Sequence, residues 1–238
     1  PINIQLFYIY KDYLYIVFDY GYIFILDTND NIVNRINISI DFIPDMCIIN
    51  DYITIVVDAC FIKLWTLDGT FYKNIPCNNW VNNFIVIDNY LYAGDDCGFI
   101  YKISTIDFQI IKTVTQHTST ILSFIYTNNH LYSSSNDKTI IEWDLNLNKY
   151  KIIFTSHHNI QNVKYYNNHL FITYMSDSLT KLDLNTYGCT ELIKPNKYIY
   201  HLFNWNNKLH LINITKQYIK IYGDFYLRDY KDLPIKTK

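Results

Sequence analysis

The sequence lacks the signals that mark membrane-spanning, secreted and metal-binding proteins. Every apolar run falls short of the ~18 residues that a membrane-spanning helix needs. The chain opens directly with alternating apolar residues, so no signal peptide is expected. Its five cysteines are odd in number and include no CxxC pair, which favours a reducing compartment. We therefore expect an intracellular protein, located in the cytoplasm and not bound to a membrane.

Motifs of catalysis are also missing. No HExxH, GxSxG or P-loop pattern occurs, and the seven histidines are scattered along the chain. The acidic pair Asp95-Asp96 is expected to shape a turn. Cys60 and Cys97 occupy turns in neighbouring parts of the chain, but we do not expect them to form a disulfide or a metal site. The sequence therefore predicts no enzyme activity, no cofactor and no metal.

Charge of either sign is scarce. The net charge is −2 and 18% of the residues are charged. Lysine and arginine form no run beyond a sparse tail, "RDYKDLPIKTK", over residues 228–238. Proteins that bind nucleic acid directly carry a basic patch or stripe, so direct nucleic-acid recognition is not expected.

Apolar and aromatic residues, in contrast, are abundant. Half of the 238 residues are apolar, with 24 tyrosines and 14 phenylalanines. This composition argues against disorder, supplies a sizeable core and is typical of strands. The apolar residues alternate with a period of two rather than 3.6, which also predicts β-strands.

A repeated pattern runs through the whole sequence. Leu131 is followed twelve residues later by Trp143, and this spacing occurs six times. The pairs are Leu14 and Leu26, Ile53 and Trp65, Leu91 and Ile103, Leu131 and Trp143, Leu170 and Leu182, and Leu209 and Ile221. The first residue of each pair is called the anchor. Successive anchors lie 39, 38, 40, 39 and 39 residues apart, a period typical of repeat architectures.

Further columns repeat with the anchors. Two residues before each anchor stands an Asn or Asp, types that tolerate the positive φ of tight hairpin turns. These residues are Asp12, Asp51, Asn89, Asn129, Asn168 and Asn207. Ten residues before each anchor stands Ile or Val, at positions 4, 43, 81, 121, 160 and 199. Agreement of several columns over six copies predicts one structural unit repeated six times.

Each unit predicts four short strands joined by turns. In the fourth unit these are the segments 121–126, 131–135, 139–145 and 149–154. Four strands in about 40 residues is the spacing of a propeller blade. We therefore predict an all-β propeller of six four-stranded blades in a single domain, residues 1–238. The approximate units are 3–40, 41–79, 80–117, 118–157, 158–196 and 197–232.

The fourth unit resembles the WD-repeat family. Its segment "SSSNDKTIIEWD" is similar to that family's S-x-D-x-T-I-x-x-W-D run. The resemblance implies a structural hydrogen-bonded tetrad of His117, Ser133 (or Ser135), Asp137 and Trp143. Gln116 replaces the glycine of the family's Gly-His pair. The position twelve residues after the anchor, which is Trp143 in unit four, is Leu or Ile in units one, three, five and six. The other repeats are thus divergent, and apolar packing is expected to replace the tetrad there.

The resemblance leaves two alternatives for the ring. The commonest propeller of the family has seven blades, whereas this chain predicts six and no spare strand for closure. Either the six blades close by face packing alone, or the ring stays open and a protein partner donates a strand or blade. The second arrangement occurs in six-bladed members of the family that build vesicle coats and nuclear-pore scaffolds.

The expected function is a non-catalytic protein–protein interaction scaffold within a larger assembly. In this fold the residue before the first strand of each blade lies on one face of the propeller, and here that column includes Phe42, Trp80 and Tyr198. Large aromatics are typical of interface hot spots; alternatively, these three plug the ring. One rival function is a ligand-binding or enzymatic propeller that uses the central channel. Another is a substrate receptor of a ubiquitin ligase. A third is a propeller associated with a ribonucleoprotein, and only the basic tail supports that one.

Overall fold

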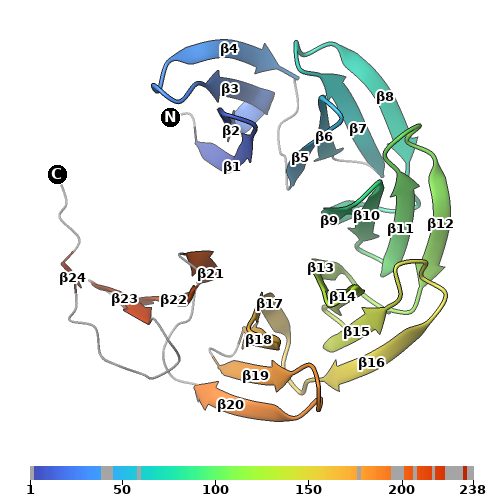
Figure 1. The fold of residues 1–238 in the computed structure, drawn as a ribbon, viewed down its shortest axis with the longest axis vertical. Coiled ribbons are helices and arrows are strands. Elements are labelled where there is room, and N and C mark those ends of the chain that lie inside the picture. The colour runs from blue at the N-terminus through green and yellow to red at the C-terminus, as the bar shows by residue number, and fades with distance from the viewer. Residues whose placement is uncertain are drawn as a thin grey trace. The chain divides into compact units, whose positions relative to one another are not determined.

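The computed structural model is built almost entirely of β-strands. It describes residues 3–38, 45–57, 60–175 and 178–193. It also describes the backbone, but not the side chains, of residues 201–205, 208–215, 218–222 and 233–234. For residues 55–57 and 193, too, only the backbone is described. The chain divides into two compact units, Pro1–Ile121 and Leu122–Lys238, which are described separately. In both, the strands form four-stranded antiparallel sheets (Figure 1). The predicted all-β class is confirmed.

The first unit contains sheets in which the strands pair in chain order. The first sheet is β1 (Ile4–Tyr10), β2 (Tyr13–Phe18), β3 (Tyr22–Leu26) and β4 (Ile32–Asn37), with a 3-10 turn, η1 (Asp19–Gly21), between β2 and β3. The second is β5 (Met46–Ile49), β6 (Tyr52–Val57), β7 (Phe61–Thr66) and β8 (Phe71–Pro76). The third is β9 (Val81–Ile87), β10 (Tyr90–Asp95), β11 (Phe99–Ser104) and β12 (Ile110–Thr115).

The second unit repeats this arrangement. The fourth sheet is β13 (Ile121–Thr127), β14 (His130–Ser135), β15 (Thr139–Trp143) and β16 (Tyr150–Thr155). The fifth is β17 (Ile160–Tyr166), β18 (His169–Tyr174), β19 (Leu179–Asp183) and β20 (Cys189–Ile193). The backbone of β21 (His201–Trp205), β22 (Lys208–Thr215), β23 (Tyr218–Tyr222) and β24 (Leu233–Pro234) pairs in the same order.

The twelve-residue spacing of the anchors has a direct structural cause. Leu131 and Trp143 are cross-strand partners in the pairing of β14 with β15. The pairs Leu14 and Leu26, Ile53 and Trp65, Leu91 and Ile103, and Leu170 and Leu182 are partners in the same way. In the last repeat Ile221 pairs with Ile212 rather than with Leu209, because the pairing of β22 with β23 runs from Leu211 to Thr215. The spacing therefore records sheet register, and the last repeat departs from it.

Three of the five described members of the Asn/Asp column adopt the positive φ that their residue types predict, whereas at Asp12 and Asn89 only the preceding residue, Lys11 or Asp88, does so. Both central residues have positive φ at Asn50 and Asp51 (48° and 64°), at Asn128 and Asn129 (49° and 62°), and at Asn167 and Asn168 (45° and 59°). Positive φ at both central residues defines the type I′ hairpin turn, whose twist matches that of the flanking strands.

We expect Asn129→Val to lower the free energy of unfolding by about 1–2 kcal/mol, because a β-branched side chain is strained at positive φ. Asn129→Gly is the control and should stay within about 0.5 kcal/mol of wild type, since glycine adopts this backbone freely. Urea titration measures both variants. Equal stability of the two variants would contradict the role assigned to this turn.

Within each unit the sheets pack face to face in a fixed order. The face of a sheet that carries its anchor is called the anchor face. In the first unit, Ile53 and Trp65 on the second sheet's anchor face join one apolar cluster with Val17 and Ile23 on the other face of the first sheet. The third sheet's Leu91 packs in the same way on the second sheet. In the second unit, the anchor face of the fifth sheet packs on the fourth. Each of these anchor faces is covered by the sheet that precedes it in the chain.

Candidate functional site

A buried carboxylate organises the loops at one end of the third sheet. Asp95 ends β10 and is fully buried, with 0% of its surface exposed. Its Oδ1 accepts the backbone N–H groups of Cys97 and Phe99, at 3.0 and 2.8 Å. Its Oδ2 accepts the Tyr101 hydroxyl at 2.8 Å and the Asn79 side-chain amide at 3.2 Å. Four donors thus satisfy a charge that burial would otherwise make costly.

Tyr101 extends this network to the loop that precedes β9. Its hydroxyl donates to Asp95 and accepts the backbone N–H of Asn78 at 2.8 Å. Burial, together with the hydrogen bond to Asp95, raises the pKa of Tyr101, so the phenol stays protonated and keeps donating. The turn role predicted for Asp95 is confirmed, whereas sequence reasoning missed Tyr101. The sequence did carry a signal for this contact. Asp95 is an acid at the end of the apolar strand β10, and Tyr101 stands two residues into the next strand, β11.

Trp80 stands on the loop that this network holds. Its carbonyl accepts the backbone N–H of Asp96 at 2.9 Å and the side-chain amide of Asn82 at 3.3 Å. Thr120 donates its hydroxyl to the carbonyl of Asp96 at 3.3 Å. The Trp80 side chain nevertheless remains 40% exposed. Of the three predicted partner-binding residues, Phe42 and Tyr198 lie outside the described residues, so only Trp80 can be placed.

Two members of the predicted tetrad meet in the fourth sheet. Trp143 is 1% exposed, and its Nε1 donates to the Ser133 hydroxyl at 2.8 Å. The structure therefore selects Ser133 over Ser135 as the acceptor. Asp137 accepts the backbone N–H and the hydroxyl of Thr139 at 2.9 and 2.6 Å. His117 is buried and belongs to the first unit, so the complete tetrad stays a prediction.

The histidines of the second unit repeat one structural arrangement. His130 Nδ1 lies 2.9 Å from the Asn128 carbonyl, and its Nε2 lies 3.5 Å from a carboxylate oxygen of Glu142. His169 contacts the Asn167 carbonyl and lies 3.2 Å from Asp183 in the same way. Each histidine thus ties a hairpin turn to the neighbouring strand. Their equivalence in two repeats favours a structural role over a catalytic one.

The two cysteines with the largest pKa shifts offer no activated nucleophile. Burial raises the pKa of Cys47 well above its usual value and that of Cys77 to about 12. A reactive cysteine needs the opposite shift, because the thiolate is the attacking species.

Among the residues that the structure describes, no group of three His, Cys, Asp or Glu side chains could hold a metal ion. Within the same residues, no helix has the length and apolar character to cross a membrane.

Among the described acids, Asp45 has the pKa that is raised most above its ordinary value. It precedes β5, accepts the Met46 N–H at 2.9 Å, and bridges to β9 through the Phe84 N–H at 3.4 Å and the Asn83 amide at 3.5 Å. Burial raises its pKa to about 6, although the backbone hydrogen bonds from Met46 and Phe84 oppose the shift. The folded protein therefore favours the protonated form, and ionisation of Asp45 destabilises it as the pH rises.

We expect Asp45→Asn to change the pH dependence of stability. The carboxyl of Asp45 has an ordinary pKa of 3.8 and a pKa of about 6 in the folded protein. As the pH rises from about 4 to 6, wild type should therefore lose stability relative to the variant. The relative change is up to roughly 3 kcal/mol, since one pKa unit corresponds to about 1.4 kcal/mol. Urea titrations at several pH values check it. Parallel pH profiles for wild type and variant would contradict the shift.

Comparison with known proteins defines the class of fold. No protein-family model and no curated protein sequence matches the chain. Among solved structures, the computationally designed Ika8 protein superimposes with a TM-score of 0.77 at 12% identity, over 95% of this chain and 72% of its own. The RRP9 WD40 repeats superimpose with a TM-score of 0.76 at 10% identity, over 98% and 81%. At such identities the likeness concerns the fold alone, and it supports the predicted β-propeller.

Proposed function

We propose that this protein is a non-catalytic scaffold for protein–protein interaction, built as a propeller of six WD-like blades within a larger assembly. The observation that carries the proposal is Trp80, an exposed aromatic side chain on a loop whose backbone is hydrogen-bonded at Asn78 and at Trp80 itself. Interface hot spots are enriched in tryptophan, and a preorganised loop loses little conformational entropy on binding. The RRP9 WD40 repeats, as a solved neighbour, are consistent with this class of function.

The other proposed functions have weaker support. A catalytic propeller would need activated nucleophiles or clustered titratable groups, and the described groups Asp95 and His169 instead hold loops and turns. The basic tail that would support attachment to a ribonucleoprotein lies outside the residues whose side chains are described. The scaffold therefore remains the function that we propose.

Trp80→Ala tests the proposal directly. If Trp80 is a hot spot, the variant should stay within about 1 kcal/mol of wild-type stability and lose partner affinity by about 30-fold or more, which corresponds to 2 kcal/mol. Urea titration and quantitative co-purification from source lysate measure the two effects. Tyr126→Ala is the matched control, since Tyr126 is 41% exposed against 40% for Trp80. A loss of more than about 2 kcal/mol in stability, with the partner retained, would show that Trp80 plugs the propeller instead.

A further inference from the structure

Trp80 and Asp96 are exposed neighbours at one end of the third sheet. The Trp80 side chain is 40% exposed, and the side chain of Asp96 is exposed as well. The backbone N–H of Asp96 donates to the Trp80 carbonyl at 2.9 Å, which links the two loops that carry these residues. Both residues belong to the first unit. An aromatic and an acidic residue thus share one surface.

The first sheet shows where a carboxylate at this position reaches. Counting from the anchors, Asn3 corresponds to Trp80 and Asp19 to Asp96. The backbone N–H of Asp19 donates to the Asn3 carbonyl at 3.0 Å, and the Asp19 carboxylate accepts the side-chain amide of Asn3 at 2.9 Å. Because the third sheet repeats this backbone hydrogen bond, we expect the Asp96 carboxylate to lie beside the Trp80 side chain.

The loops of this surface are held in place by their neighbours. The Thr120 hydroxyl donates to the Asp96 carbonyl at 3.3 Å. Gly98 has a φ of 88°, and a Cβ at this position would lie 2.4 Å from the His117 carbonyl oxygen. Glycine is therefore needed for the turn to pack this closely on the next loop. A surface built on loops held in this way loses little conformational entropy when it binds.

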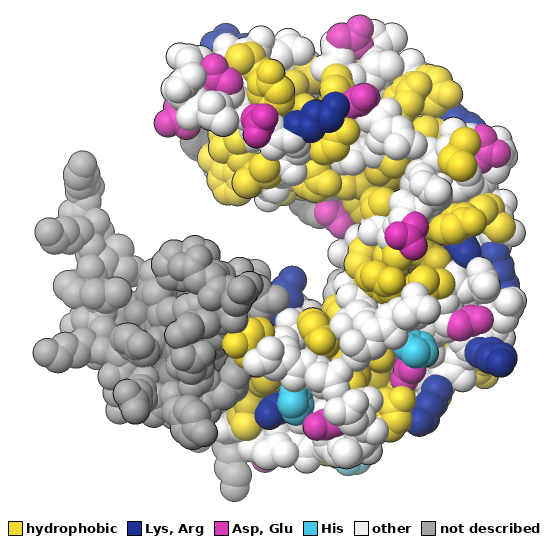
Figure 2. All heavy atoms as spheres, in the orientation of Figure 1, with side chains coloured by type: hydrophobic (Ala, Val, Ile, Leu, Met, Phe, Trp, Pro, Cys, Tyr) yellow, Lys and Arg dark blue, Asp and Glu magenta, His cyan; other side chains and the backbone are white. Residues whose placement is uncertain are grey.

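The loops at this end of the third sheet carry negative charge. Residues 77–80, 95–98 and 116–120 include Asp95, Asp96 and the buried His117, and no lysine or arginine. Desolvation raises the pKa of the Cys97 thiol, and the negative charge of Asp96 raises this pKa further. The thiol also hydrogen-bonds to the Asp96 carboxylate, but it is a weak donor, so the carboxylate can still accept a stronger one. Figure 2 shows acidic side chains next to hydrophobic ones on the viewed face of the first unit.

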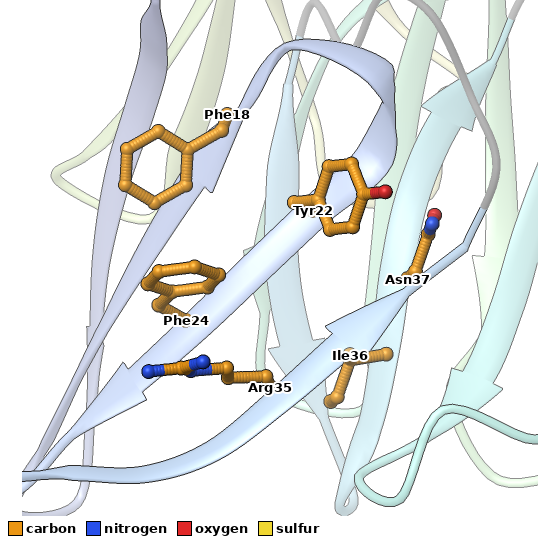
Figure 3. Close-up of a pocket in the computed structure, with 6 residues that line it drawn as sticks. All are labelled: Phe18, Tyr22, Phe24, Arg35, Ile36 and Asn37. Carbon is orange, nitrogen blue, oxygen red and sulfur yellow. The ribbon is translucent and has the colours of Figure 1, made fainter. Parts of the chain in front are cut away.

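Other aromatic residues of the first unit show how a ring and a carboxylate hold a cation. The Lys11 ammonium lies 2.8 Å from a carboxylate oxygen of Asp51 and 5.0 Å from the centroid of the Tyr10 ring. The Arg35 guanidinium lies 5.1 Å from the centroid of the Phe24 ring (Figure 3). The face of an aromatic ring attracts cations, and tryptophan attracts them most strongly. The end of the third sheet offers the same combination of ring and carboxylate.

We infer that Trp80 and Asp96 together form a recognition site for a lysine or arginine side chain of the partner protein. The cation lies over the face of the indole and pairs with the Asp96 carboxylate. The partner segment that contacts this surface is therefore basic, since complementary charge gives an interface its specificity. The inference rests on the proposed scaffold function and adds to it the chemistry of the partner.

Peptide selection on the full chain tests the inference. A phage library of short random peptides is panned on wild type, Trp80→Ala and Asp96→Asn, and the selected peptides are sequenced. We expect the peptides that require Trp80 to contain lysine or arginine, and we expect Asp96→Asn to lose them. Asp88→Asn is the matched control and should select the same peptides as wild type, because Asp88 is an exposed acid in the turn between β9 and β10, at the other end of the same sheet.

A neutral replacement of the cation completes the test. In one selected peptide, citrulline replaces the arginine, or acetyl-lysine replaces the lysine, and both forms are titrated against wild type and Asp96→Asn. Affinity for wild type should fall by about tenfold or more, whereas affinity for Asp96→Asn should fall by about twofold or less, because the charged partner is already missing. The comparison with wild type does not depend on the folding of any variant.

The other results overturn the inference. Peptides that require Trp80 but contain no cation would exclude the cationic site and leave the proposed scaffold function standing. Equal losses for wild type and Asp96→Asn on neutral replacement would show that the carboxylate takes no part. If no selected peptide requires Trp80, the surface does not bind basic segments. The scaffold function is judged separately, by the partner that co-purifies with wild type and is lost from Trp80→Ala.

Discussion

Replacing Trp143 with alanine is expected to lower the free energy of unfolding by about 3–5 kcal/mol. The side chain is 1% exposed, its ring centroid lies 5.6 Å from that of Tyr150, and its Nε1 donates to Ser133. Alanine would leave a large cavity and remove the indole donor from the buried Ser133 hydroxyl, and both effects destabilise. Total domain stability is typically 5–15 kcal/mol, so the loss should be evident in a urea melt.

Two further variants separate the causes of this effect. Trp143→Phe retains much of the volume but removes the donor, and should cost less than alanine. Trp80→Ala removes the same side chain from a position that is 40% exposed, and should cost about 1 kcal/mol or less. A Trp143→Ala variant within about 1 kcal/mol of wild type would mean that the indole contributes little to the core.

The second large effect is expected at Asp95. Asp95→Ala should destabilise the protein by about 3–5 kcal/mol, because the buried network loses the acceptor shared by its donors. The hydroxyl of Tyr101, the amide of Asn79 and two backbone N–H groups would lose this partner together. Asp95→Asn keeps one acceptor oxygen and should fall between wild type and alanine. Guanidinium or urea titration measures all of these variants.

Asp96 provides the control for Asp95. It is the next residue in the chain, but its side chain is exposed, so Asp96→Ala should change stability by no more than about 0.5 kcal/mol. Comparable losses at the two positions would contradict the network as the source of the effect. Because the Asp95 network holds the loop of Trp80, a local loosening in Asp95→Ala should also reduce the proposed partner binding.

The fold was predictable because repeats encode local register. The spacing between Leu131 and Trp143 reflects one cross-strand pair, and the turn at Asn128 and Asn129 reflects one backbone conformation. Both are determined by residues close in sequence. The predicted strands of the fourth unit consequently match β13 to β16 within a few residues at each end.

The polar networks were less predictable because they join loops that approach only in the folded sheet. The sequence favoured Ser133 and kept Ser135 as an alternative, and the hydrogen bond from the Trp143 indole agrees with Ser133. Tyr101 reaches Asp95 across the pairing of β10 with β11, which neither residue type alone indicates. The raised pKa of Asp45 depends on burial beside β9, a separate repeat.

Pairing between strands that are consecutive in the chain also has a kinetic consequence. In the described sheets each strand hydrogen-bonds to the next along the sequence, so every pairing closes only a short loop and costs little entropy. Structure can then nucleate within any one sheet and spread to its neighbours, as in a one-dimensional array. Within the first unit, the anchor faces of the second and third sheets are buried against the sheet before them, so their amide hydrogens should exchange slowly and together, through openings that involve two adjacent sheets.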